Sequence, residues 1–231
     1  MALKDPSITP KGEIGNSTMT DFFNARYLQE QYDHMAESYT ESRSLFDNTD
    51  QLEELAQLIS PKSTILDLGC GTGLPVAKFF AEGGYNVTGI DLSDKMIRLA
   101  KENVPDAVFY TDNIINTDLS ENSFDLIVSF YCLFHLRKEP QKVLFNKIMH
   151  WLKTDGYAYF TLATKEYTGQ EDFEGTIHFE NNILPYSHYS LAEYNKIFQD
   201  IGATLVSMKK HTIGGETMLW VLLKKPKNPT S

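Results

Sequence analysis

The chain has 231 residues, of which 42% are hydrophobic and 23% are charged, a composition that excludes wholesale disorder and suffices for one sizeable core. The formal net charge of −10 disfavours DNA or RNA as the main partner, because an acidic protein repels phosphate backbones. No apolar run approaches the roughly 18 residues that span a bilayer, and residues 1–11 lack the apolar core of a secretory signal, so we expect no membrane partner.

The first quarter of the chain predicts a loose terminus followed by helices. Residues 1–20 are rich in Lys, Pro, Gly, Ser and Thr without a hydrophobic period, so we expect them to be flexible. An apolar and aromatic stripe at helical spacing predicts a helix over residues 24–42. The pair Asp50 and Glu53 has the spacing of a capping box and predicts a second helix from about residue 50 to Pro61.

Strands and helices then alternate. The expected strands are 64–68, 86–90, 108–111, 124–129 and 157–164, and helices are expected up to residue 82, after Ser93 and from Pro140. Such alternation predicts a mostly parallel sheet with helices on both faces. A capping box at Ser190 begins a last helix, and strands 205–209 and 218–223 flank the turn Gly214-Gly215, so one of them must run antiparallel.

One segment between these elements shows no clear period. Residues 165–189 predict a loop that covers the substrate, because loops of this length in a compact domain usually carry function or move. Elsewhere the chain has only two cysteines, Cys70 and Cys132, too few for a disulfide scaffold or a zinc site. We therefore expect a cytoplasmic protein without a bound metal.

Glycines stand where strand 64–68 gives way to a helix. Gly69, Gly71 and Gly73 allow a tight turn and the close approach of a ligand to the backbone. The dinucleotide fingerprint G-x-G-x-x-G needs a further glycine where this chain has Leu74. The spacing favours a ligand without a pyrophosphate and leaves an NAD-dependent oxidoreductase as an alternative.

Three carboxylates follow the ends of neighbouring strands. Asp67 stands beside the glycines and can accept from a ligand ammonium group, and Asp91 can accept from the hydroxyls of a ribose. Asp112 can accept from the exocyclic amine of an adenine ring that Met96 and Ile114 sandwich. The sequence therefore predicts a site for an adenosine with a cationic group.

Residues 65–73, 87–93, Asp112 and 124–129 together resemble the class I S-adenosylmethionine-dependent methyltransferases of small-molecule type, near the branch of methyltransferase domains 11 and 25. The resemblance covers about residues 22–223 and implies a doubly wound Rossmann-like α/β fold. Its seven-stranded sheet is mostly parallel with an antiparallel last strand. We expect residues 21–231 to form this single domain, with S-adenosyl-L-methionine as cofactor and S-adenosyl-L-homocysteine as product. The cofactor-binding residues expected from the motifs and the resemblance are Asp67, Gly69, Cys70, Gly71, Gly73, Asp91, Leu92, Met96, Asp112, Asn113, Ile114 and Phe130.

The expected acceptor is a small molecule, which receives the methyl group by in-line displacement. A base is needed only where the attacking atom carries a proton. Many small-molecule members of this family carry two histidines after the fourth strand, whereas this chain has Phe134 and His135. His135 and His188 are the candidate bases. The predicted substrate pocket consists of Tyr32, Tyr39, Tyr131, His135, Tyr186, His188 and Tyr189.

Other functions remain open at this stage. A protein or RNA methyltransferase would use the same cofactor site, and a non-catalytic protein can bind the cofactor without transferring a methyl group. The sequence does not identify the acceptor, its reacting atom or the oligomeric state.

Overall fold

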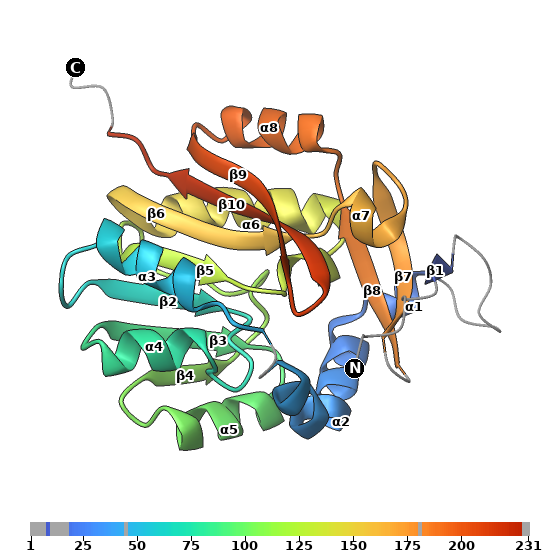
Figure 1. Ribbon diagram of the computed structural model, residues 1–231, viewed down its shortest axis with the longest axis horizontal. Helices are drawn as coiled ribbons and strands as arrows, with labels where there is room; N and C mark the ends of the chain where they lie inside the picture. The colour runs from blue at the N-terminus through green and yellow to red at the C-terminus, as the bar shows by residue number, and fades with distance from the viewer. Residues whose placement is uncertain (1–7, 10–18, 44–45, 180–181, 228–231) are drawn as a thin grey trace.

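The structure is a computed structural model that describes residues 8–9, 19–43, 46–179 and 182–227, with residues 8–9, 19–20 and 37–43 described by their backbone alone. Its main sheet has the strand order β4-β3-β2-β5-β6-β10-β9 (Figure 1). Strands β4, β3, β2, β5 and β6 pair in parallel, and β10 runs antiparallel to both β6 and β9. The predicted seven-stranded sheet with a reversed last strand is therefore confirmed. The strands are β2 Thr64–Leu68, β3 Asn86–Asp91, β4 Val108–Thr111, β5 Phe124–Ser129, β6 Leu152–Leu162, β9 Thr204–Ile213 and β10 Glu216–Lys224.

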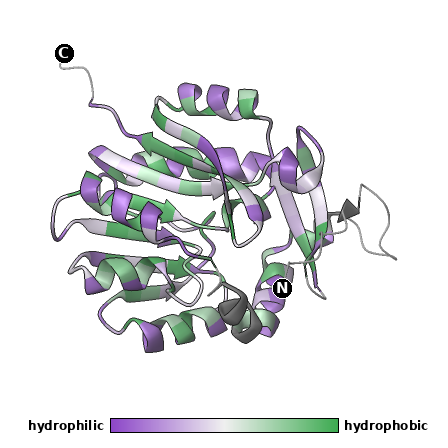
Figure 2. Ribbon diagram, viewed as in Figure 1, coloured by the Kyte–Doolittle hydropathy of each residue, from purple (hydrophilic) through white to green (hydrophobic). Residues whose placement is uncertain are grey.

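Helices cover both faces of this sheet. On one face α3 (Thr49–Leu58), α4 (Val76–Glu82) and α5 (Asp94–Asn103) bury their apolar sides in a core that includes Phe80 and Trp220. On the other face α6 (Lys138–Trp151) and α8 (Leu191–Asp200) bury theirs. In Figure 2 the hydrophobic residues gather on the central strands, and hydrophilic residues mark the outer sides of the helices. Burial of both sheet faces explains why the central strands are apolar runs without alternation.

Side-chain caps fix two helix starts where the sequence predicts them. The Ser93 hydroxyl accepts from the Met96 backbone N–H at the start of α5, and the Ser190 hydroxyl accepts from the Glu193 N–H at the start of α8. The capping box predicted at Asp50 is wrong, because α3 starts one residue earlier and has Asn48 at its N-cap position. That residue makes no capping hydrogen bond.

The loop predicted for residues 165–189 is also wrong. This segment forms a short helix α7 (Lys165–Thr168) and an antiparallel hairpin of β7 (Phe173–Phe179) and β8 (Asn182–His188). Its pattern shows no period because residues 184–188 of β8 are all buried, so polar residues do not alternate with apolar ones. Strand β1 (Ile8–Thr9) adds to the outer edge of β7.

The hairpin and the N-terminal helices lie beyond the carboxyl ends of the parallel strands. Figure 1 shows α2 (Ala25–Arg43) and the β7–β8 hairpin on the side to which the arrowheads of β2, β3 and β5 point. The short helix α1 (Met19–Phe22) contacts both hairpin strands, and the 3₁₀ turn η1 (Leu133–His135) contacts β8. Together these segments cover the edge of the sheet where ligands bind in open α/β folds.

Most of the predicted flexible terminus, residues 1–7 and 10–18, lies outside the described residues. Among the residues that are described, no helix is both long and apolar enough to cross a bilayer. The described part of the chain also contains no cluster of three or more His, Cys, Asp or Glu side chains suited to a metal ion.

Candidate functional site

The glycine loop between β2 and α4 adopts a backbone that other residues rarely take. The φ angles of Gly69, Gly71 and Gly73 are 71°, 52° and 77°, in the left-handed region. A Cβ atom on Gly69 would lie 2.3 Å from the Sγ atom of Cys132. Glycine is therefore required at position 69 for two independent reasons, backbone conformation and space.

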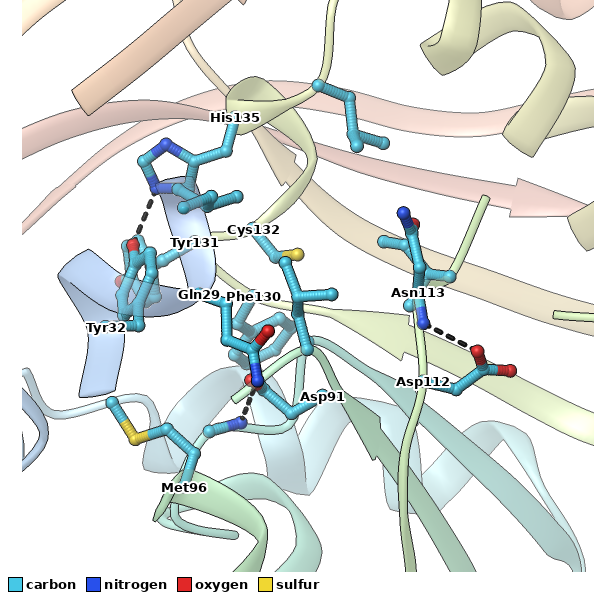
Figure 3. A pocket seen from close by; sticks show the side chains of 16 residues that line it. Gln29, Tyr32, Asp91, Met96, Asp112, Asn113, Phe130, Tyr131, Cys132 and His135 are labelled. Atoms are coloured by element: carbon cyan, nitrogen blue, oxygen red, sulfur yellow. Dashed lines mark hydrogen bonds between the residues drawn. The ribbon is translucent and has the colours of Figure 1, made fainter. Parts of the chain in front are cut away.

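Asp91, the last residue of β3, holds this loop in place. Its Oδ2 atom accepts from the Gly71 N–H at 2.9 Å (Figure 3), and its Oδ1 atom accepts from the Ser93 N–H at 2.9 Å. Burial raises the pKa of this carboxyl above its usual value. Each carboxylate oxygen retains a further lone pair, so Asp91 can also accept from ligand hydroxyls.

A cavity opens above the loop, between the carboxyl ends of the strands and helix α2 (Figure 3). Its lining residues come from the glycine loop, from the ends of β3, β4 and β5, from α2 and from η1. They are Leu28, Gln29, Tyr32, Gly69, Gly71, Asp91, Leu92, Met96, Asp112, Asn113, Ile114, Phe130, Tyr131, Cys132, His135 and Leu136. We call it the main cavity.

The main cavity brings together most of the predicted cofactor residues: Gly69, Gly71, Asp91, Leu92, Met96, Asp112, Asn113, Ile114 and Phe130. Asp67 and Cys70 line a second, adjoining cavity beneath the glycine loop. A Cβ on Gly73 would face the side chains of Val104 and Phe109, so this glycine lets the loop pack against them. Gly73 lines neither of these cavities.

Asp112 lies at the end of β4, at the edge of the main cavity. Its Oδ1 atom accepts from the Asn113 N–H at 2.8 Å, and its Oδ2 atom accepts from the Thr117 hydroxyl at 2.7 Å. In Figure 3 its carboxylate points away from Asp91 and Cys132. These bonds fix the turn after β4. The contact of Asp112 with an adenine ring stays a prediction.

Asp67 is a buried carboxylate at the end of β2, with 2% of its surface exposed. No side-chain hydrogen bond or ion pair reaches it from the described residues. Burial raises the pKa of Asp67 to about 8, and the nearby Asp91 carboxylate adds to this increase. A buried charge is normally paired with an opposite charge. The ionised Asp67 carboxylate has no such partner among the described residues, and a cationic group of a ligand can supply it.

A hydrogen-bonded pair closes the main cavity on the side of α2. The Tyr32 hydroxyl lies 2.7 Å from Nε2 of His135, and Nδ1 of His135 lies 2.8 Å from the Pro185 carbonyl oxygen in β8. A carbonyl only accepts, so Nδ1 carries a proton and donates. In the neutral imidazole Nε2 is then an acceptor, and the Tyr32 hydroxyl donates to it.

The predicted substrate residues divide into two groups. Tyr32, Tyr131 and His135 line the main cavity, and Tyr186 lines a narrow slot that continues from Tyr32 and His135. The Tyr39 side chain lies outside the described residues. His188 and Tyr189 line neither the main cavity, the second cavity nor the slot.

His188 is instead fully buried in the base of the hairpin. Its Nε2 atom lies 2.6 Å from the Thr168 hydroxyl, its Nδ1 atom 3.1 Å from the Tyr189 carbonyl oxygen, and its ring stacks on Phe173. Tyr189 packs edge-on against Tyr194 of α8. The placement of both residues in the substrate pocket is therefore corrected: they join the hairpin to α7 and α8.

Sequence reasoning missed several lining residues of the main cavity. Leu28 and Gln29 stand one helical turn before Tyr32 on α2, so the spacing of that stripe was a usable signal. Cys132 and Leu136 flank the η1 turn, and no pattern marks them as cavity residues. The tight turn after β5, where Tyr131 has a φ of 56°, positions these two residues at the cavity.

The charges around the main cavity distinguish between ligands. Its described lining residues include the carboxylates Asp91 and Asp112 and no Lys or Arg. A pyrophosphate would meet carboxylates without a compensating cation, whereas a nucleoside with a cationic group fits this lining. The residues present thus fit an adenosyl amino acid and do not fit a dinucleotide.

Comparisons with known proteins agree with this assignment. A family model described as a methyltransferase domain matches residues 65–156. The chain is 30% identical to phosphoethanolamine N-methyltransferase of Plasmodium falciparum over 121 residues, which are 50% of this chain and 46% of that protein. An uncharacterized methyltransferase of Geobacillus is 26% identical over 204 residues, 83% of this chain and 91% of that protein. The chain thus spans about half the length of the first of these relatives.

Solved structures extend the likeness of the fold to nearly the whole chain. The crystal structure of Burkholderia thailandensis 1,6-didemethyltoxoflavin-N1-methyltransferase, with bound 1,6-didemethyltoxoflavin and S-adenosylhomocysteine, superposes with a TM-score of 0.71 at 17% identity. The superposition covers 97% of each chain. The matched family model identifies residues 65–156 as a methyltransferase domain of the class I S-adenosylmethionine-dependent type, and the superposition shows that nearly the whole chain shares the fold of such an enzyme.

Proposed function

We propose that this protein transfers a methyl group from S-adenosylmethionine to a small-molecule acceptor. The observation that carries the proposal is the glycine loop, held to Asp91 beneath a cavity without basic residues among its described lining. When bound, S-adenosylmethionine supplies a methyl group that is already activated on a sulfonium. The chain's own contribution is then to bind, to align and to exclude water.

The residues of the main cavity supply matched binding groups. The lone pairs of Asp91 accept from ribose hydroxyls, and Met96 and Ile114 offer apolar surfaces to an adenine ring. Asp67, in the second cavity, offers its negative charge to an ammonium group. Helix α2 covers these residues through Leu28, Gln29 and Tyr32, which keeps water away from the reacting atoms.

The Tyr32–His135 pair serves an acceptor whose attacking atom carries a proton. Tyr32 lines the main cavity, and its phenol oxygen can take that proton while its own proton passes to Nε2 of His135. The Pro185 carbonyl, which accepts from Nδ1, then stabilises the positive charge on the imidazole. This gives His135 the role of base through Tyr32, whereas buried His188 has none.

We also propose that the hairpin covers the acceptor, the role expected of residues 165–189, because its Tyr186 lines the slot. A single domain over residues 21–231 and a cytoplasmic location, both expected from the sequence, are proposals of the same kind. The small-molecule nature of the acceptor agrees with the names of the relatives, a phosphoethanolamine and a didemethyltoxoflavin methyltransferase.

The test is a methyl-transfer assay with the purified protein and methyl-labelled S-adenosylmethionine. The acceptors are a cell extract separated into small molecules, proteins and RNA. We expect release of S-adenosylhomocysteine and label in the small-molecule fraction only. Label in protein or RNA would contradict the proposed acceptor class, and tight cofactor binding without release on any fraction would favour a non-catalytic binder.

A further inference from the structure

Asn48 occupies the N-cap position of α3 and does not cap the helix. An asparagine there normally accepts from a backbone N–H of the first turn, and that bond stabilises the helix. Asn48 has φ −106° and ψ 13° and makes no capping bond. Its Nδ2 instead donates to the Tyr131 hydroxyl at 3.3 Å. With 2% of the residue exposed, its Oδ1 is buried and accepts no hydrogen bond from any described residue.

The partner of Asn48 is itself held in an unusual conformation. Tyr131 follows β5 with a φ of 56°, a left-handed backbone that is strained for a residue with a side chain. Its backbone N–H donates to the Thr161 hydroxyl at 2.6 Å, and its ring packs edge-on against Phe46 at 5.3 Å. These contacts direct the Tyr131 hydroxyl to Asn48, where it fixes the orientation of the amide.

Both Asn48 and Tyr131 line the second cavity together with Asp67. Asp67 and the Oδ1 atom of Asn48 are therefore two acceptors on one cavity, and the buried Oδ1 atom receives no hydrogen bond from the described residues. Such an acceptor is costly to bury unless something donates to it. An unused N-cap residue, a strained tyrosine and an uncompensated carboxylate thus meet in one place.

A ligand group that satisfies both acceptors must donate hydrogen bonds, and a positive charge on it also offsets the charge of the ionised Asp67 carboxylate. An ammonium group has three donors and no acceptor, whereas a phosphate or carboxylate would be repelled by Asp67. The second cavity shares Gly69, Gly71, Phe130 and Tyr131 with the main cavity. A ligand whose adenosine lies in the main cavity can therefore extend its amino-acid end into the second.

We propose that Asn48 is a specificity residue that recognises the α-ammonium group of the cofactor, its Oδ1 accepting a hydrogen bond from that group beside Asp67. This inference rests on the proposed function, because it concerns the same cofactor. The proposed role explains why Asn48 does not cap helix α3 and why Tyr131 has a left-handed backbone.

The test compares two ligands by calorimetry. One is S-adenosylhomocysteine, and the other is its deaminated analogue, adenosylthiobutanoate, which lacks only the α-amino group. We expect Asn48→Ala to weaken the binding of S-adenosylhomocysteine about tenfold and to leave that of the analogue unchanged. Asn86→Ala is the matched control, because its amide binds the Lys62 carbonyl at the opposite end of β3. It should alter neither affinity.

Two further variants guard against a loss of folding. Asn48→Asp retains an acceptor and should keep or strengthen the preference for the amino form, and Tyr131→Phe should reduce it while keeping the ring. Equal losses for both ligands in Asn48→Ala and Asn48→Asp would assign Asn48 a purely structural role and overturn the inference. Failure of the wild-type protein to bind either ligand would instead overturn the proposed function.

Discussion

The Tyr32 hydroxyl and the Nε2 atom of His135 lie 2.7 Å apart, although 103 positions separate the two residues in the chain. The bond joins helix α2 to the turn after β5, and the Pro185 carbonyl on the other side of the imidazole joins that turn to the hairpin. One histidine thus connects helix α2, the turn after β5 and the hairpin. The same contacts that assemble the cavity also prepare His135 to accept a proton.

Removal of either member of this pair should slow methyl transfer. We expect Tyr32→Phe and His135→Ala each to lower kcat by roughly 10²–10⁴-fold for an acceptor whose attacking atom carries a proton. The binding of S-adenosylhomocysteine should change little in Tyr32→Phe, because the ring remains. Rates of S-adenosylhomocysteine release measure the effect. His34→Ala, an exposed histidine on the same helix, is the control. Full activity of Tyr32→Phe would remove the pair from the mechanism.

The buried carboxylate of Asp67 makes stability depend on pH. Its pKa is about 8 in the folded protein against an ordinary 3.8, so between these values the folded state binds more protons than the unfolded state. Stability contributed by the protonated group is therefore lost as pH rises through this window. Asp67→Asn should raise the free energy of unfolding of the ligand-free protein by at least about 1 kcal/mol above pH ~8. It should also weaken the binding of S-adenosylhomocysteine.

Denaturant unfolding at acidic and alkaline pH measures this effect on the wild type and the variant. The two curves should converge at low pH, where Asp67 is protonated in both states. An Asp67→Asn protein that is less stable than the wild type above pH ~8 would contradict the assignment of Asp67 as an uncompensated charge.

The glycine loop offers a contrast between neighbouring positions. Gly69→Ala should lower stability by about 2–4 kcal/mol, because a Cβ there is strained at φ 71° and meets the Cys132 Sγ at 2.3 Å. Gly71→Ala, with no atom within 4 Å of the added Cβ, should cost about 1 kcal/mol from its backbone alone. Urea unfolding compares the two variants. The double variant Gly69→Ala, Cys132→Gly should recover part of the loss, and no recovery would show that the clash is not its source.

His188 should support the fold and not the reaction. His188→Ala should destabilise the protein by about 1–3 kcal/mol, since it removes a fully buried ring that hydrogen-bonds the Thr168 hydroxyl and stacks on Phe173. Burial lowers the pKa of His188 in the folded protein below its ordinary 6.5. Between the lowered pKa and 6.5, the unfolded state therefore binds more protons than the folded state. Wild-type stability should therefore decline as pH falls through 6.5, and His188→Asn should decline less. Thermal melts across this range measure both effects. If His188→Ala lost turnover without a change in stability, His188 would act in the reaction, and this prediction would be wrong.

The sequence predicts the sheet, and it predicts that the candidate cofactor residues gather at one edge of that sheet, because both depend on local patterns. Apolar strands that end in Asp67, Asp91 and Asp112 define one edge of a parallel sheet, and aligned carboxyl ends gather these residues without further information. The glycine spacing predicts the tight loop for the same reason. The reversed last strand follows from the short turn at Gly214.

The residues around the methyl acceptor are positioned by contacts between distant parts of the chain, which no local sequence pattern predicts. The Tyr32–His135 bond requires the packing of α2 over the sheet, and the place of His188 requires the register of a hairpin, in which it pairs with Phe173. A shift of one residue in such a register exchanges the faces of a strand. The role proposed for Asn48 rests on the absence of a capping bond, which the sequence does not indicate.

The most direct test of the cofactor assignment is calorimetric titration of the purified protein with S-adenosylhomocysteine and with NAD, in the wild type, Asp91→Ala and the exposed control Asp106→Ala. The account predicts that S-adenosylhomocysteine binds and NAD does not. Asp91→Ala should weaken the former by about 1–3 kcal/mol, through the loss of a charged acceptor, and Asp106→Ala should have no effect. Binding of NAD in place of S-adenosylhomocysteine, or unchanged affinity in Asp91→Ala, would contradict it.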